Sequence, residues 1–271
     1  KNLVNAGVMI FSPSVFKYLT ELRKYNYEKD IIVPLINDGK VVSYKSSEYA
    51  KDMGTPERYR RVQEDYNSGI CDAKNLANKQ KAIFLDRDGT INEYVGFLRK
   101  EEDFRLIPGV SEAIKKINNS GYLAIVVTNQ PVIARGEVTE EELEEIHKKM
   151  ETLLGLDGAY IDDIYYCPHH PDKGFEGEIP ELKIECDCRK PKTGMLEKAA
   201  REHNIDLSSS IMIGDSTLDI KMAENAGMQS ILLKTGQKGE DGKYDVSPTL
   251  IAEDLNDAIN KIICKKASKK L

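Results

Sequence analysis

The segment KAIFLDRDGTIN, residues 81–92, decides the fold of this chain. Residues 82–85 form a short apolar run, which is typical of a strand buried in a parallel sheet. This strand ends abruptly in the charged turn Asp86-Arg87-Asp88-Gly89-Thr90. Open α/β sheets bind ligands beyond the carboxyl ends of their strands, so we expect Asp86 and Asp88 to face a ligand. The alternative is an ordinary Asp-Gly turn that closes a hairpin.

The chain after residue 81 alternates apolar strands with amphipathic helices. Thr139 and Glu142 have the spacing of a capping box at one helix start. His203, near the end of another helix, is expected at the surface. The alternation predicts an α/β fold, a Rossmann-like parallel sheet with helices on both faces. Strands are predicted at residues 82–85, 122–127, 161–166, 211–213 and 229–233, and helices at 110–119, 139–154, 194–203, 218–226 and 250–264.

The first 66 residues form a separate predicted unit of small α/β type. Strands are expected at residues 8–11 and 39–44, and a helix at residues 13–22. Thr55 before Pro56 is typical of a helix N-cap followed by proline in the first turn. Residues 67–80 are polar and predict a linker or a short connecting helix. The domains are therefore expected at residues 1–66 and 81–271, joined by residues 67–80.

Composition limits the classes of function. The 271 residues are 40% hydrophobic and 31% charged, and the net charge is −6. An acidic chain is a poor match for nucleic acid or for an anionic membrane surface. No apolar run approaches the ~20 residues of a membrane span, and the first residues do not resemble a signal peptide. We therefore expect a cytoplasmic protein whose partner is a small molecule.

The residues at the ends of three predicted strands, together with Lys190, predict a phosphoryl-transfer site if they converge. Asp86 would attack phosphorus to give an aspartyl phosphate, and Asp88 would protonate the leaving oxygen. Thr128 would hold the phosphoryl oxygens, and Lys190 would neutralise their charge. Asp215, with the Asp86 carboxylate and the carbonyl of Asp88, would bind Mg²⁺, which prefers oxygen ligands. Each residue alone has an ordinary alternative, such as a cap, a surface charge or a turn.

A second constellation combines cysteine and histidine. Cys167-Pro168-His169 and Cys186-Asp187-Cys188 together offer four soft ligands, which suit tetrahedral Zn²⁺. A complete set of four leaves no open position, so the zinc is expected to be structural and to pin residues 172–185. The alternatives are a disulfide between Cys186 and Cys188 or free thiols. His169 is expected to be the ligand rather than His170.

The order DRDGT, a strand-ending Thr, a Lys and then Gly214-Asp215 resembles the haloacid dehalogenase superfamily of phosphatases. In addition, CPHHPD and CDCRKPKTGML beside DRDGTIN resemble the D-glycero-D-manno-heptose 1,7-bisphosphate phosphatase family, which includes histidinol-phosphatase relatives. The resemblance implies that Arg189 contacts the far phosphate of the substrate, which is the one that does not react. It also implies that the loop around Tyr94 lines the sugar. It departs at TNQPVIARG, where Pro131 and Val132 replace Ser and Gly, and at Ser216. The residues expected to bind substrate are Arg87, Asn92, Tyr94, Asn129, Gln130 and Arg189.

The start of the chain carries a different resemblance. VNAGVMIFSPSVF and EYAKDMGTPERY look like the C-terminal part of a sugar-1-phosphate nucleotidyltransferase. The resemblance places Asn5 and Gly7 by the sugar and Asp52 at a divalent metal. The Gly-rich nucleotide-binding segment of that family is absent from the sequence, so the unit is expected to be catalytically incomplete and the remaining transferase portion to lie upstream.

These patterns favour a Mg²⁺-dependent phosphoric monoester hydrolase that also holds zinc. The expected reaction is removal of the 7-phosphate of heptose 1,7-bisphosphate in nucleotide-activated heptose synthesis, in a protein that is bifunctional at full length. The alternatives are a histidinol-phosphate phosphatase and a sugar-1-phosphate guanylyltransferase with an accessory C-terminal module.

Overall fold

The computed structural model describes residues 6–268 and divides the chain into two compact units. The smaller unit spans residues 3–46, and the larger unit begins at Ser47. The division therefore falls earlier than the boundary expected after residue 66, because residues 47–66 belong to the larger unit. Asn5, expected near a sugar, lies outside the described residues.

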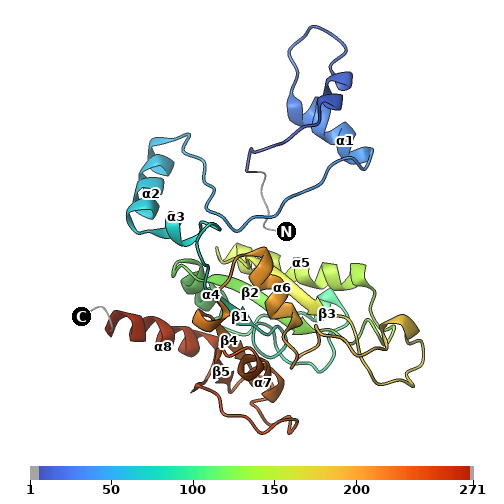
Figure 1. Cartoon of the computed structure of the whole chain (residues 1–271), viewed down its shortest axis with the longest axis vertical. Coiled ribbons are helices and arrows are strands. Elements are labelled where there is room, and N and C mark those ends of the chain that lie inside the picture. Colours follow the sequence, from blue (N-terminus) through green and yellow to red (C-terminus); the bar gives the residue numbers. More distant parts are fainter. Residues whose placement is uncertain (1–5, 269–271) are drawn as a thin grey trace. The chain divides into compact units, whose positions relative to one another are not determined.

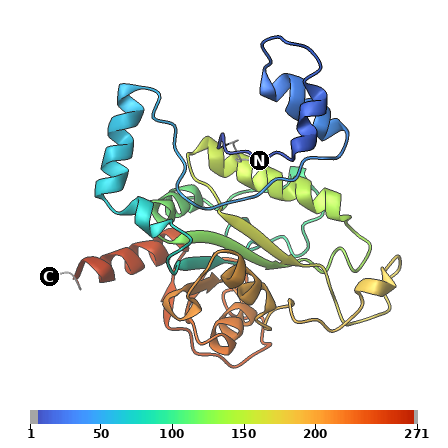
Figure 2. The same cartoon turned by 45° about the horizontal axis from the view of Figure 1, so that its top comes forward.

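The larger unit is built on one parallel sheet of six strands (Figures 1 and 2). Every neighbouring pair runs parallel, in the order β3-β2-β1-β4-β5-β6. The strand of the opening segment, β1, lies at the centre and is buried at all four positions. The strands are β1 (Ala82–Leu85), β2 (Leu123–Asn129), β3 (Asp163–Cys167), β4 (Ile211–Gly214), β5 (Gln229–Leu233) and β6 (Leu250–Ala252).

Helices cover both faces of this sheet, which confirms the predicted fold class (Figure 1). Successive side chains of a strand point to opposite faces, so Ile83 and Leu85 pack in one core cluster while Ala82 and Phe84 pack in the other. The first cluster includes residues of α4 (Val110–Asn118), α5 (Glu140–Leu156) and α8 (Leu255–Ser268). The second includes residues of α6 (Gly194–Glu202) and α7 (Thr217–Asn225).

Helix boundaries follow the local signals except at one place. The predicted capping box of α5 is present: Glu142 N donates to Thr139 Oγ1 (3.1 Å), and Thr139 N donates to Glu142 Oε2 (2.8 Å). The helix expected from residue 250 instead begins at Leu255, because residues 250–252 form β6 against β5. Three apolar residues fit either structure until a neighbouring strand is available.

Residues 47–80 lead into the sheet through α2 (Pro56–Asn67) and α3 (Ile70–Ala73). The predicted cap of α2 is present, since Thr55 Oγ1 accepts from Arg58 N. Beyond α3, Lys74 Nζ donates to Tyr160 OH (2.6 Å) and lies 3.7 Å from Asp162 Oδ1. This contact attaches the predicted linker to the sheet domain.

His203 is buried, so the expectation of a surface residue was wrong. Its Nε2 lies 3.1 Å from Asp163 Oδ2, and its Nδ1 lies 3.2 Å from Ser47 Oγ. Two polar partners make burial of the imidazole acceptable at a helix end that the sequence pattern alone places at the surface.

The smaller unit contains short helices and, among its described residues 6–46, no strand. The strands expected at residues 8–11 and 39–44 were therefore wrong. A strand needs a neighbour to accept and donate its backbone hydrogen bonds, and these segments have none here. Of the described residues in this unit only Ile31 is buried. Its elements are η1 (Pro13–Tyr18), η2 (Glu28–Ile32) and α1 (Val33–Asn37).

Among the described residues, no helix combines the length and the apolar character that crossing a bilayer requires.

Candidate active site

The carboxyl ends of β1, β2 and β4 meet at one edge of the sheet and carry the predicted phosphoryl-transfer residues. Asp86 follows β1, Thr128 is the next-to-last residue of β2, and Asp215 follows β4. All three line a cavity of about 240 Å³, together with Lys190 from the loop before α6. The register explains the convergence, since Leu85 pairs with Val126 on one side and with Ile213 on the other.

Lys190 is buried between two carboxylates. Its Nζ lies 2.8 Å from Asp86 Oδ1 and 2.6 Å from Asp219 Oδ1. Burial alone would lower the pKa of this amine, but the charges of Asp219 and Asp86 outweigh burial and raise the pKa. Lys190 is therefore a fixed cation beside the predicted nucleophile, which is the arrangement that stabilises charge on a transferring phosphoryl group.

Three carboxylates form the most acidic part of the site. One oxygen each of Asp86, Asp215 and Asp219 lies within 4.8 Å of the others, and all three residues are buried. Burial raises the pKa of Asp86 to about 7 despite Lys190, with help from the charges of Asp219 and Asp88. Burial and the charges of Asp86 and Asp219 likewise raise the pKa of Asp215 to about 8. Lys190 is the one described cation in contact with this cluster of three carboxylates, so negative charge is in excess.

A hard divalent cation fits this cluster. Lys190 supplies one positive charge against three carboxylates, and oxygen donors are what Mg²⁺ prefers. The backbone also comes unusually close to Asp215: a Cβ atom on Gly89 would lie 2.1 Å from Asp215 Oδ2, and one on Gly236 would lie 2.0 Å from it. Only glycine permits such an approach, and both residues have positive φ. Asp219 is the third carboxylate of this cluster, in addition to the expected ligands Asp86 and Asp215.

The Asp88 carboxylate turns away from the cluster toward Arg87. Arg87 Nη2 donates to both oxygens, at 2.9 Å to Oδ1 and 2.8 Å to Oδ2. Asn92 Nδ2 donates to Oδ1 (3.0 Å), and Gln130 Nε2 donates to Oδ2 (2.9 Å). Burial would raise the pKa of Asp88, but the Arg87 charge and these hydrogen bonds outweigh it and hold the pKa below its ordinary value.

Two residues expected to bind substrate do not reach the cavity. The side chain of Arg87 is fully buried and points back at Asp88 and α5. Asn92 is buried and donates to Asp88 and to the carbonyl of Glu93. Neither side chain therefore lines the cavity as expected, because both donate to the ionised carboxylate of Asp88, which lies one residue from Arg87 and four from Asn92.

Asn129 and Gln130 line the cavity, but their amides brace neighbouring residues. Asn129 Oδ1 accepts from Lys190 N (3.0 Å), which holds the backbone of the buried lysine. Gln130 Nε2 donates to Thr128 Oγ1 (2.8 Å). Since this hydroxyl oxygen already accepts a hydrogen bond, its own proton is available for an oxygen in the cavity.

Basic and aromatic residues complete the lining of the cavity, and we call them the outer wall: Tyr94, Phe97, Arg135, His170, Arg189 and Lys243. Of the residues predicted to bind substrate, Tyr94 and Arg189 lie on this wall. Arg135 was not expected in the site; its guanidinium carbon lies 4.2 Å from the ring centre of Phe97 and 4.3 Å from that of Phe175. Gln237 was not expected either, and it donates from its backbone to Asp215 and from its side chain to Tyr94 OH. Lys243 and His170 complete this part of the lining.

These omissions have different causes. Gln237 follows β5, so the rule that ligands lie beyond strand ends was a usable signal for it. Arg135 and Lys243 sit in loops whose course no periodic pattern predicts.

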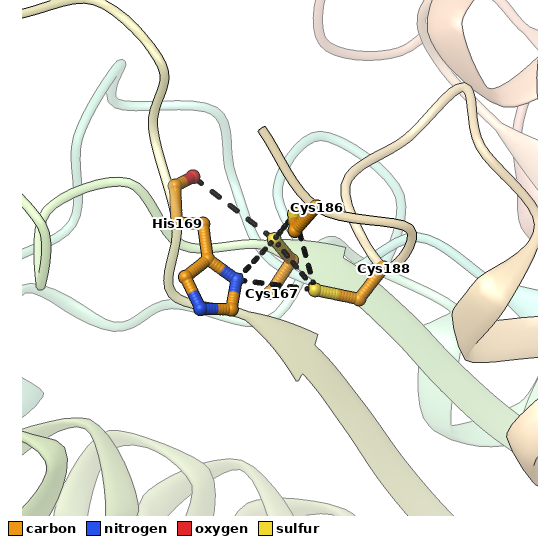
Figure 3. Close-up of side chains that lie close together, drawn as sticks. All are labelled: Cys167, His169, Cys186 and Cys188. Carbon is orange, nitrogen blue, oxygen red and sulfur yellow. Dashed lines mark hydrogen bonds between the residues drawn. The ribbon is translucent and has the colours of Figure 1, made fainter. Parts of the chain in front are cut away.

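The four predicted zinc ligands lie together beside the cavity (Figure 3). The sulfur atoms are 3.2–3.6 Å apart, and His169 Nδ1 lies 3.2 Å from Cys188 Sγ. A disulfide requires sulfur atoms about 2.05 Å apart, so the thiols are not paired. Tetrahedral ligands at about 2.3 Å from zinc would lie at separations close to those observed. Hydrogen bonds, first from Cys167, lower the pKa of Cys188 to about 5, which favours its thiolate.

This cluster bears directly on the cavity wall. Arg189 and Lys190 follow Cys188 in the chain, and Arg189 Nη1 donates to the carbonyl of His169 (3.1 Å). The position of both cations therefore depends on the loop that the four ligands hold.

The chain is similar to several known proteins. A family model described as HAD-hyrolase-like matches residues 187–258. The D-glycero-beta-D-manno-heptose-1,7-bisphosphate 7-phosphatase of Haemophilus ducreyi is 44% identical over 160 residues, covering 58% of this chain and 85% of that protein. The D-glycero-alpha-D-manno-heptose-1,7-bisphosphate 7-phosphatase of Photorhabdus laumondii is also 44% identical over 160 residues. That match covers 59% of this chain and 85% of that protein.

A solved structure is similar as well. It is the D,D-heptose 1,7-bisphosphate phosphatase of B. bronchiseptica, in complex with magnesium and phosphate. The TM-score is 0.61 and the identity 31%, and the match covers 69% of this chain and 99% of that one.

Proposed function

Since the chain belongs to the family of D-glycero-D-manno-heptose-1,7-bisphosphate 7-phosphatases, we propose that it removes the 7-phosphate of that sugar bisphosphate. The observation that carries the proposal is the convergence of Asp86, Thr128 and Lys190 at one sheet edge, in a cavity that Arg135, Arg189 and Lys243 also line. A sugar bisphosphate needs one set of residues to bind the phosphate that reacts and a second set of cations to bind the phosphate that stays.

Asp86 is the proposed nucleophile. Its carboxylate attacks phosphorus to form an aspartyl phosphate, and the sugar oxygen leaves. Lys190 and the Thr128 hydroxyl bind the phosphoryl oxygens during the transfer. When bound by Asp86 and Asp215, Mg²⁺ offsets the repulsion between the nucleophile and the phosphate. Water then attacks the aspartyl phosphate and releases inorganic phosphate.

Asp88 is the proposed general acid and base. A phosphate dianion bound beside Asp88 adds like charge, which favours the protonated carboxyl group and so permits donation to the leaving oxygen. The carboxylate that remains is held by Arg87, Gln130 and Asn92. In that state it takes a proton from the hydrolytic water.

The far phosphate is proposed to bind at the outer wall. Arg189, Arg135 and Lys243 line the cavity, and the one carboxylate described in contact with them, Glu137 at 3.9 Å from Arg135, is outside the lining. The Arg135 guanidinium is held between Phe97 and Phe175, so it is ordered before substrate binds. Preorganised cations reduce the entropy lost on binding a second phosphate.

Zinc is proposed to be structural, bound by Cys167, His169, Cys186 and Cys188. The four donors leave no open position for chemistry. The bound zinc would instead hold the loop of residues 172–185 in place and fix the position of Arg189.

We also propose that residues 1–66 belong to a sugar-1-phosphate nucleotidyltransferase portion. Removal of the 7-phosphate leaves a sugar 1-phosphate, which is the class of substrate that such a transferase activates. This supports a place in nucleotide-activated heptose synthesis.

Phosphate release tests the proposed function. The chain with Mg²⁺ is offered both anomers of heptose 1,7-bisphosphate, histidinol phosphate and p-nitrophenyl phosphate. The expected kcat/KM for one heptose anomer exceeds that for the other two substrate types by about 100-fold or more, because only it engages the outer cations. Phosphorus NMR should show that the 1-phosphate remains.

Asp86→Asn should abolish turnover, lowering kcat by at least about 10⁴-fold, as loss of a nucleophile does. Asp157→Asn, at an exposed position after α5, is the matched control and should keep full activity. Absence of phosphate release from heptose bisphosphate by the wild type would refute the proposed substrate.

A further inference from the structure

Arg87 occupies an unusual position for an arginine in a phosphatase site. It is fully buried, lies between two catalytic carboxylates in sequence, and touches no part of the cavity lining other than Asp88 and Gln130 among the contacts described for its side chain. A buried arginine needs acceptors for its donors, since each unpaired donor costs free energy. The groups that accept hydrogen bonds from Arg87 therefore indicate what this residue does in the site.

Arg87 donates in two directions. Toward the cavity, Nη2 binds both oxygens of Asp88 and lies 3.0 Å from Gln130 Oε1. Away from the cavity, Nη1 lies 3.2 Å from His147 Nε2, on α5. A guanidinium can only donate, so His147 must accept with a lone pair on Nε2 and carry its proton on Nδ1. The imidazole is neutral in this contact.

The same rule orients Gln130. Its Oε1 must face Arg87, so its amino group faces Asp88 Oδ2 (2.9 Å) and Thr128 Oγ1 (2.8 Å). Hydrogen bonds therefore run in one direction from the guanidinium of Arg87 to the groups that face the cavity. His147 anchors this arrangement from a helix that contributes nothing else to the described cavity lining.

We propose that His147 and Arg87 form a buried positioning pair that holds the Asp88 carboxyl group where it serves the leaving oxygen. The inference rests on the proposed function, in which Asp88 protonates that oxygen. Asp88 is otherwise attached to the wall only through Asn92 and Gln130 among its described contacts, and Gln130 is itself oriented by Arg87. Without an acceptor at position 147, Arg87 turns toward another partner and Asp88 loses its bidentate contact.

The test compares leaving groups. An alkyl phosphate such as a sugar phosphate needs protonation of its leaving oxygen, whereas the nitro group of p-nitrophenyl phosphate stabilises the departing phenolate. His147→Leu should therefore lower kcat about tenfold or more for the sugar phosphate, with KM little changed, and much less for p-nitrophenyl phosphate. Asp88→Asn removes the proposed general acid altogether, so its loss of kcat toward the sugar phosphate is the largest selective loss expected.

Two further variants separate positioning from general damage. His147→Gln retains an acceptor oxygen for Arg87 and should restore most of the activity toward the sugar phosphate. His203→Leu removes a similarly buried imidazole that contacts Asp163 and Ser47, remote from Asp88, and should leave the ratio of the two activities unchanged. Circular dichroism and thermal unfolding monitor the fold of each variant.

The outcomes are distinct. An equal loss toward both substrates, no loss at all, or a selective loss that His147→Gln fails to restore would each overturn the inference. Failure of the proposed function would appear in the wild type as lack of turnover of heptose bisphosphate. In that event the ratio is measured with whichever alkyl phosphate the wild type accepts, histidinol phosphate included.

Discussion

At the scale of single residues, the four aspartates at the carboxyl edge of the sheet differ in the groups that they contact. Asp86 and Asp219 share Lys190, Asp215 is approached by two glycine backbones, and Asp88 is bound by an arginine. The partners shift the pKa values in opposite directions, raising those of Asp86 and Asp215 and lowering that of Asp88. Neighbouring carboxylates with different acidities are suited to different tasks in one reaction.

His147 predicts a pH dependence of stability. Burial, and next the Arg87 charge, lower its pKa from 6.5 to about 3. Between those values the unfolded chain binds a proton that the folded chain does not, so stability falls as the pH drops from 6.5 toward 3. The slope from this residue is at most about 1.4 kcal/mol per pH unit.

Urea unfolding at pH 7 and at pH 5 measures this effect. His147→Gln, which does not titrate, should lose less stability between the two pH values than the wild type. Equal losses would show that His147 does not contribute to the acid sensitivity.

At the scale of elements, the loop of residues 172–185 depends on contacts from outside itself. It holds one short 3₁₀ helix, Pro180–Leu182, and its backbone meets Ala134 through the amide of Ile179. The Cys and His cluster encloses it at both ends. Such a segment has too small a core to fold alone, which makes the metal a source of folding free energy.

Zinc content tests this dependence. The purified chain should contain about one equivalent of zinc, and Cys186→Ser should lose it and lower the melting temperature by roughly 4–8 °C, for a loss of about 2 kcal/mol. KM for the bisphosphate should rise, because Arg189 is anchored on His169. Cys71→Ser, outside the cluster, is the control and should keep its zinc. A zinc-free wild type with full activity and stability would contradict the assignment.

At the scale of the whole molecule, the two units differ in how they are stabilised. The larger unit has a core on both faces of its sheet, whereas Ile31 is the sole buried residue among those described in the smaller one. Deleting residues 1–46 should therefore leave phosphate release and the unfolding of the larger unit unchanged.

A longer deletion, to residue 80, should be destabilising. It removes Lys74, the partner of the buried Asp162, and an unpaired buried carboxylate costs about 3 kcal/mol. Lys74→Met in the full chain isolates this contribution, and urea unfolding measures both. Equal stability of chains that begin at residues 47 and 81 would show that the Lys74–Asp162 ion pair does not contribute to stability.

The sequence by itself determined the alternation of strands and helices after residue 81, apart from β6, and identified Asp86, Thr128, Lys190 and Asp215 as residues at the carboxyl edge of the sheet. Those features are encoded locally, in apolar runs such as residues 82–85 and in caps such as Thr139. Only the tertiary structure decided which polar residues face the cavity. Arg87 and Asn92 follow β1 as Asp86 does, yet both donate to Asp88 and do not line the cavity, since a buried donor takes the nearest ionised acceptor. The same reason separates residues 8–11 from β1: a strand forms only where a neighbour completes its hydrogen bonds.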